Sequence, residues 1–133
     1  MNGRNENITD DGLAHVPYLV SLSLSHNAVI TDAGLRHVPK LRKLNLCKNN
    51  TITIAGLTAV PELTSLDISW NGVFVDSDLA YIPELRDLRI QCNSMISDAG
   101  LVHVPKLRRL DIKYNYVITD AGLAHVPLAY VIR

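Results

Sequence analysis

Cysteine, net charge and long apolar runs are all scarce in this sequence of 133 residues. Two cysteines, Cys47 and Cys92, are far fewer than a disulfide-stabilised secreted domain carries, so a reducing, intracellular compartment is favoured. Thirteen Lys and Arg balance thirteen Asp and Glu, so the chain lacks the basic field typical of proteins that bind nucleic acid or anionic membranes. No apolar run approaches the ~20 residues of a membrane span. We therefore expect no nucleic-acid or membrane partner.

Residue clusters typical of catalysis or metal binding are also missing. Histidines recur within His-Val-Pro at positions 15, 37, 103 and 125, but no Cys, Asp or Glu ligands accompany them to complete a tetrahedral metal site. His26 and Cys47 are expected near each other, without a third group to orient the imidazole or a pocket to hold a substrate. Hence we predict no catalytic residue, no metal and no cofactor, and the protein is not expected to be an enzyme.

An internal repeat of 22 residues dominates the sequence. Proline recurs at positions 17, 39, 61, 83, 105 and 127 with no insertion, and leucine and asparagine keep the same spacing. One unit, residues 30–49, reads ITDAGLRHVPKLRKLNLCKN. Such regular self-similarity predicts a solenoid in which each unit packs against its neighbours.

Residues 41–49 match L-x-x-L-x-L-x-x-N, and the repeats therefore resemble those of leucine-rich-repeat proteins. The Ile-Thr-Asp-Ala-Gly-Leu prefix is similar to repeats of bacterial and F-box members of that family. The resemblance covers nearly the whole chain, and residues 1–133 are expected to form a single domain with about five full repeats, a partial one and no clear capping repeat. It implies an α/β solenoid with one parallel β-sheet on the concave face and short helical or 3-10 segments on the convex face. Because the family is defined by a scaffold, the resemblance names no partner.

The alternation within each repeat predicts one half-buried strand. Leu44 and Leu46 point to one side, whereas Lys43, Asn45 and Cys47 point to the other. The next strand arrives 22 residues later in the same direction, so the sheet must be parallel.

The segment that returns to the next strand begins with a helix-capping signal. Thr31 or Asp32 can accept hydrogen bonds from the first turn, and the proline ends the helical geometry. In the third and fourth units Thr53 and Asp76 remain as capping candidates. Asp78 replaces the usual glycine, which indicates that this position does not require a glycine-only backbone conformation.

Asparagines at the strand exits are predicted to be structural, because stacked amides can satisfy the backbone groups of neighbouring turns. These residues are Asn27, Asn49, Asn71, Asn93 and Asn115.

Function is expected on side chains that point outward from the strands, where rings and charges gather in the C-terminal half. Trp70 and Tyr114 fall in one exposed column, and aromatic residues and arginine dominate interface hot spots. Asp67, Arg89 and Asp111 are placed to form a ladder of alternating charge across neighbouring strands, as are Asp87 and Arg109. The predicted partner-binding residues are Trp70, Tyr114, Arg89, Asp67, Asp87, Arg109, Asp111, Gln91 and Lys113.

The pattern therefore favours a protein–protein interaction module that binds a protein or peptide on the concave face. An alternative is a structural subunit, or a fragment of a larger receptor, effector or ubiquitin-ligase adaptor, that makes contact through its solenoid ends. The chain opens on a return segment and closes on an irregular strand, residues 128–133. Both end layers are expected to expose aliphatic surface, so the chain is expected to self-associate end to end, to pack against another subunit or to be a fragment of a longer array.

Overall fold

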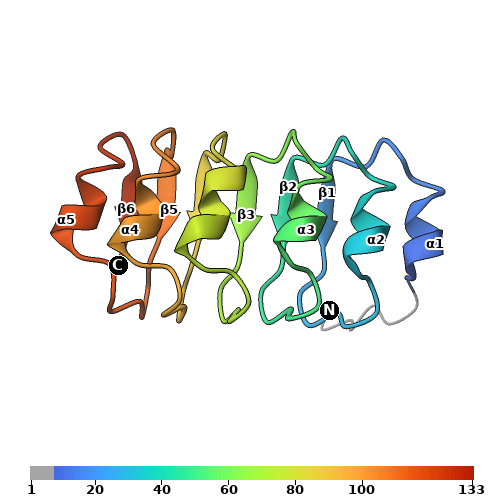
Figure 1. The fold of residues 1–133 in the computed structure, drawn as a ribbon, viewed down its shortest axis with the longest axis horizontal. Coiled ribbons are helices and arrows are strands. Elements are labelled where there is room, and N and C mark those ends of the chain that lie inside the picture. Colours follow the sequence, from blue (N-terminus) through green and yellow to red (C-terminus); the bar gives the residue numbers. More distant parts are fainter. Residues whose placement is uncertain (1–7) are drawn as a thin grey trace.

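The computed structural model describes residues 8–133 and shows a solenoid with strands along one side and short helices along the other (Figure 1). The six strands form one parallel sheet in chain order. Their bounds are β1 Ser21–Ser23, β2 Lys43–Asn45, β3 Ser65–Asp67, β4 Asp87–Arg89, β5 Arg109–Asp111 and β6 Tyr130–Ile132. The helices are α1 Asp10–Leu13, α2 Asp32–Leu35, α3 Ile54–Leu57, the 3-10 helix η1 Asp76–Tyr81, α4 Asp98–Leu101 and α5 Asp120–Leu123. The predicted fold class is confirmed.

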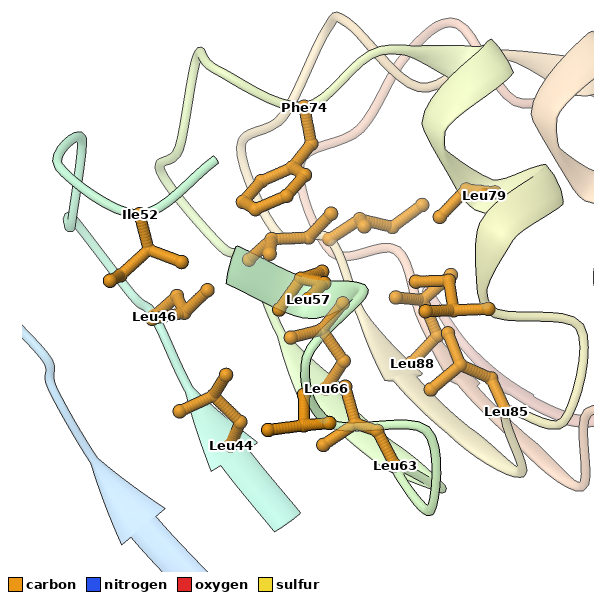
Figure 2. Close-up of a cluster of buried hydrophobic side chains, with 14 of the residues drawn as sticks. Leu44, Leu46, Ile52, Leu57, Leu63, Leu66, Phe74, Leu79, Leu85 and Leu88 are labelled. Carbon is orange, nitrogen blue, oxygen red and sulfur yellow. The ribbon is translucent and has the colours of Figure 1, made fainter. Parts of the chain in front are cut away.

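The core lies between the sheet and the helices as stacked layers of leucine and isoleucine (Figure 2). Leu44 and Leu46 point inward, as their alternation predicts, and Leu66 and Leu88 continue the layer of Leu44 in the next two strands. Phe74 takes the place that Ile52 has one repeat earlier and is also buried. Burying each large side chain contributes about 1.5–3 kcal/mol, so the stacked layers are the main source of stability.

A hydroxyl-bearing residue begins each four-residue α-helix. The N-cap residues are Thr9, Thr31, Thr53, Ser97 and Thr119. Thr31 Oγ1 accepts a hydrogen bond from Ala33 N at 3.3 Å, which satisfies one of the free N–H groups of the first turn. Of the two candidates in this repeat, Thr31 is therefore the cap, and Asp32 is free for another contact.

The carboxylate of Asp32 joins its repeat to the next one. Its Oδ1 accepts from Thr53 N at 2.8 Å and its Oδ2 accepts from Thr53 Oγ1 at 2.6 Å. The same pair of bonds, here called an aspartate bridge, links Asp10 to Thr31, Asp76 to Ser97 and Asp98 to Thr119. The hydrogen bonds from Thr119 hold the pKa of the Asp98 carboxyl below its ordinary value.

A glycine in each bridge leaves room for the carboxylate. A Cβ atom at Gly100 would lie 2.6 Å from Asp76 Oδ1, and one at Gly56 would lie 3.1 Å from Asp32 Cγ. No glycine within residues 8–133 has a positive φ. The prediction that this position does not demand a glycine-only conformation is therefore confirmed, and the glycine is explained by close packing instead.

The junction between α3 and η1 lacks the bridge, and three substitutions there form one set. Ile54 stands where the bridge has Asp, Val75 where it has Thr, and Asp78 where it has Gly. Because no carboxylate enters from Ile54, position 78 has room for a side chain, and Asp78 Oδ2 accepts from Val75 N at 2.9 Å. The prediction that Asp76 caps this helix is wrong, since its carboxylate bridges to Ser97.

The asparagines at the strand exits are buried and form a continuous ladder. Asn49 Oδ1 accepts from Thr51 N at 2.9 Å and from Ile52 N at 3.1 Å. Asn49 Nδ2 donates to Leu24 O at 3.0 Å and to Asn27 O at 2.8 Å. The next three asparagines in the ladder likewise donate to the carbonyl oxygen of the preceding one. This is the hydrogen bonding that the structural interpretation of these residues requires.

Candidate functional site

The outward side chains of the strands line up in rows across the sheet, and these rows together are here called the sheet face. The strand register places Ser21, Lys43, Ser65, Asp87 and Arg109 in the first row. It places Ser23, Asn45, Asp67, Arg89 and Asp111 in the second. A third row follows at the ends of the strands and holds Ser25, Cys47, Ser69, Gln91 and Lys113. Neighbouring strands lie about 4.8 Å apart, so side chains within a row are close enough to contact one partner together.

Each of the first five strands leaves the sheet through a residue in the left-handed backbone conformation. This exit column has φ values between 51° and 57° and consists of His26, Lys48, Trp70, Cys92 and Tyr114. The conformation costs a residue other than glycine roughly 1–2 kcal/mol. Glycine would make the same turn at a lower cost, so the backbone alone does not account for large side chains here.

Two aromatic rings of the exit column project into solvent. The exposed fraction is 55% for Trp70 and 67% for Tyr114. Lys48 Nζ lies 5.2 Å from the centroid of the Trp70 ring, a cation–π contact of about 0.5–1 kcal/mol at an exposed position. Trp70 thus contacts Lys48 and remains exposed to solvent.

The charged residues of the sheet face pair differently from the expected cross-strand ladder. Within residues 8–133, the ion pair on this face joins Arg89 Nε to Asp87 Oδ1 at 3.7 Å, and both residues belong to β4. The same Asp87 oxygen is buried and accepts no hydrogen bond among the described residues, so Arg89 provides its compensation. Arg109 is exposed on the adjacent strand β5.

Two aspartates of the sheet face accept hydrogen bonds from backbone N–H groups two residues later in the chain. Asp67 Oδ1 accepts from Ser69 N at 2.9 Å, and Asp111 Oδ1 accepts from Lys113 N at 3.2 Å. Gln91 Nε2 donates to Asp111 Oδ2 at 2.7 Å. Asp111 is only 5% exposed, although the alternation placed it on the open face. Among the predicted binding residues, Asp67, Gln91 and Asp111 therefore have structural hydrogen bonds, whereas Trp70, Tyr114, Arg109 and Lys113 are exposed.

Sequence reasoning missed exposed apolar side chains in the turns that follow the exit column. Tyr116, two residues after Tyr114, is 87% exposed, and Met95 is also exposed in the neighbouring repeat. The sequence did contain a signal for Tyr116, because the equivalent positions in the other repeats hold much smaller side chains. Those positions are Ala28, Asn50, Gly72 and Ser94.

The described residues offer no assembled reactive centre. Both cysteines are free thiols, as predicted. Burial, and then the negative charge of Asp67, raises the pKa of the Cys47 thiol, which disfavours the nucleophilic thiolate. Over residues 8–133 there is no group of three or more His, Cys, Asp or Glu side chains that could hold a metal ion. No helix in the same range has the length and hydropathy to cross a bilayer.

A family model described as Leucine Rich repeat matches residues 15–36, 61–79 and 103–124. A comparison with curated protein sequences gave no match.

Solved structures share the fold. An internalin (inlF) from Listeria monocytogenes is 24% identical with a TM-score of 0.69, and the Rad7 and Elc1 complex in yeast is 15% identical with a TM-score of 0.70. Each alignment covers 96% of this chain and 38% of that one. The TLR13–ssRNA13 complex is 19% identical with a TM-score of 0.66, over 90% of this chain and 19% of that one. The chain thus spans well under half the length of these structures.

Proposed function

Because the chain belongs to the leucine-rich-repeat family, whose fold is typically a non-enzymatic binding scaffold, we propose that it binds a protein or peptide partner on its sheet face. The observation that carries the proposal is the exposure of Trp70 and Tyr114 from strained backbone positions on a rigid sheet. Glycine at these positions would relieve the backbone strain, so a larger residue there indicates that its side chain serves a function. Exposed aromatic rings are the usual anchors of a binding hot spot.

Binding is centred on the C-terminal half of the sheet face. The first strand offers Ser21 and Ser23, whose small side chains make few contacts. Strands β3 and β5 are followed by Trp70 and Tyr114, the two aromatic residues of the exit column. Strand β5 also carries the exposed Arg109. The partner is therefore expected to cover an apolar centre with a polar rim, the usual anatomy of a protein interface.

A protein partner fits this surface better than a nucleic acid. The TLR13 structure contains single-stranded RNA, and the Rad7 structure contains a second protein, Elc1. On this sheet face, Lys113 and Arg109 lie among acidic residues such as Asp87. A surface of mixed charge lacks the continuous positive potential that binds a phosphate backbone.

The test is a quantitative affinity capture from the native cell, with the wild-type chain and with the variants Trp70→Ala and Tyr114→Ala. A genuine partner is enriched by the wild type, and its dissociation constant is then measured with purified protein. Each variant should weaken binding by more than about 1 kcal/mol while the melting temperature stays nearly unchanged, because the rings lie outside the core.

Ser23→Ala is the control, since Ser23 lies in the second row of the sheet face, in the N-terminal half where the partner is not expected to bind. It should bind as the wild type does. The proposal fails if the purified partner binds both aromatic variants with wild-type affinity.

The second candidate function is a structural role in which the solenoid ends make the contacts. Partly buried aliphatic residues favour it, because within residues 8–133 seven of the nine such residues packed against the core lie in the end layers. They are Ile8, Leu19 and Leu22 at one end and Ile118, Leu123, Ala129 and Val131 at the other. Surface of this kind is a common place for another repeat or subunit to pack.

A further inference from the structure

The aspartate bridge needs an acidic residue on one repeat and a hydroxyl residue with a glycine on the next. Both halves are present at every bridged junction inside the chain. The two ends of the solenoid each keep one half of a bridge that no described residue completes. Thr9 and Gly12 stand at the first repeat, and Asp120 stands at the last.

At the N-terminal end, no residue from 8 to 133 fills the space beside Gly12, which is here called the socket. A Cβ atom at Gly12 would meet nothing closer than Thr9 Oγ1 at 3.7 Å, whereas one at Gly100 would lie 2.6 Å from a carboxylate oxygen. Thr9 Oγ1 accepts from Gly12 N at 3.3 Å, but it has no carboxylate to donate to among residues 8–133. At the other bridges the glycine makes room for a carboxylate. Gly12 is its counterpart in the first repeat, but no described residue occupies the space beside it.

The C-terminal end retains the matching carboxylate. The side chain of Asp120 is 91% exposed and contacts Arg133 Nη2 at 2.7 Å. That ion pair is itself exposed, and pairs of this kind contribute at most about 1 kcal/mol, so Arg133 can be displaced. In the bridged repeats the equivalent carboxylates accept both an N–H and an O–H hydrogen bond.

The rest of each end layer is complementary in the same way. Ile118 and Leu123 are partly exposed, although Ile30 and Leu35, their equivalents in an inner repeat, are fully buried. The sheet also ends in two edge strands, β1 and β6, which leave main-chain groups open to a further parallel strand. One end thus carries the carboxylate and the other end carries the hydroxyl and the glycine, as at each bridged junction inside the chain.

We propose that copies of this chain associate head to tail, with Asp120 of one copy bridging to Thr9 and entering the space beside Gly12 of the next. The contact continues the repeat-to-repeat interface already present within the chain. It is heterologous, so it does not close after two copies and builds open chains of copies. The inference rests on the second candidate function and is independent of binding on the sheet face.

Sedimentation velocity over a range of protein concentrations tests the proposal. The wild type should form a growing series of oligomers as its concentration rises. Gly12→Asp should weaken association by about tenfold or more, because the new side chain fills the socket and repels Asp120. This variant should still fold, because Asp78 already occupies the equivalent position at the unbridged junction. Circular dichroism checks the folding of each variant.

Asp120→Ala should weaken association to a similar extent from the other end. Mixing the two variants provides the decisive observation, since each retains one intact end. An equimolar mixture should form a one-to-one dimer that does not grow further, while each variant alone stays monomeric at the same concentration.

Gly72→Ala is the matched glycine control, because a Cβ atom there meets nothing within 4 Å, and it should associate as the wild type does. Trp70→Ala should also leave association unchanged, which separates this proposal from the sheet-face proposal. A wild type that stays monomeric at all concentrations overturns the inference. So does a closed dimer that survives Gly12→Asp. If either occurs and the end variants lose a different protein partner, the second candidate function stands without self-association.

Discussion

At the scale of single residues, the exit column lowers the stability of the fold through backbone strain but presents side chains at the surface. Tyr114 has a φ of 57°, and its ring is largely exposed, so the residue gains little burial in return for a strained backbone. The buried asparagine that follows each exit residue satisfies the turn whatever side chain precedes it. The identity of the exit residue is therefore available for recognition.

Two substitutions at Tyr114 should separate strain from side-chain contacts. Tyr114→Gly should be more stable than Tyr114→Ala by about 1 kcal/mol, because only alanine keeps the cost of the left-handed conformation. The free energy of unfolding from urea denaturation measures this difference. Both variants should bind the partner more weakly than the wild type. Equal stability of the two variants would show that the turn carries no strain.

Asn71→Ala should lower the free energy of unfolding by about 1–3 kcal/mol, because it leaves buried backbone groups without partners. Asn71 Oδ1 accepts from Val73 N at 2.8 Å, and its amide donates to the carbonyl oxygen of Asn49. Asn50→Ala, a change at an exposed asparagine of the neighbouring repeat, is the control. A denaturation midpoint equal to that of the wild type would rule out the ladder role for Asn71.

At the scale of elements, the helices are held together by side chains rather than by their own length. A four-residue helix has a single turn and little stability in isolation. The aspartate bridges and their glycines fix one turn against the next, and the α3–η1 junction instead has two apolar residues, Ile54 and Val75, and a carboxylate, Asp78, that bonds within its own turn. The residues at such a junction must change together, because a carboxylate without its hydroxyl partner would lose its hydrogen bonds.

A mutant cycle at this junction should show strong coupling. Ile54→Asp alone should destabilise the fold, because the new carboxylate meets Val75 and Asp78 instead of a hydroxyl and a glycine. Adding Val75→Thr and Asp78→Gly should recover stability, with a coupling energy in the range of about 0.5–3 kcal/mol. Urea denaturation of the single, double and triple variants measures it. Additive effects would contradict the view that the three positions form one set.

At the scale of the whole molecule, each repeat contacts only its neighbours along the solenoid (Figure 1). Stability in such an array is close to a sum of repeat and junction contributions. Inner repeats have two junctions and the end layers have one, which matches the partial exposure of Leu22 and Val131.

Hydrogen exchange should therefore be slowest in the central strands and faster at both ends. The amides of Ile68 and Ile90 donate hydrogen bonds to the next repeat. Their opening free energy should exceed that of the Tyr130 amide by roughly 1 kcal/mol or more. Mass spectrometry of exchanged peptides measures this gradient. Uniform protection from β1 to β6 at low protein concentration would contradict it. At high concentration the ends should gain protection if copies join head to tail.

The sequence by itself determined the solenoid, the parallel strands, the register of β1 to β5 and the buried leucines, whereas β6 pairs with β5 at a spacing of 21 residues that the repeat does not predict. A period of two within each strand and a constant spacing of 22 residues leave a single arrangement in which Leu44 and its equivalents stack. The outward rows follow from the same two periods, and so does the column that holds Trp70 and Tyr114.

Only the tertiary structure decided how the polar side chains are used. Asp32 was a capping candidate in its own repeat but bonds to Thr53 in the next, and Asp111 was expected to be open but is buried beneath Gln91. Such contacts join residues 20 or 21 positions apart, where several acceptors compete for each donor. A local pattern cannot rank these competitors, because their order depends on distances that exist only after the turns have stacked.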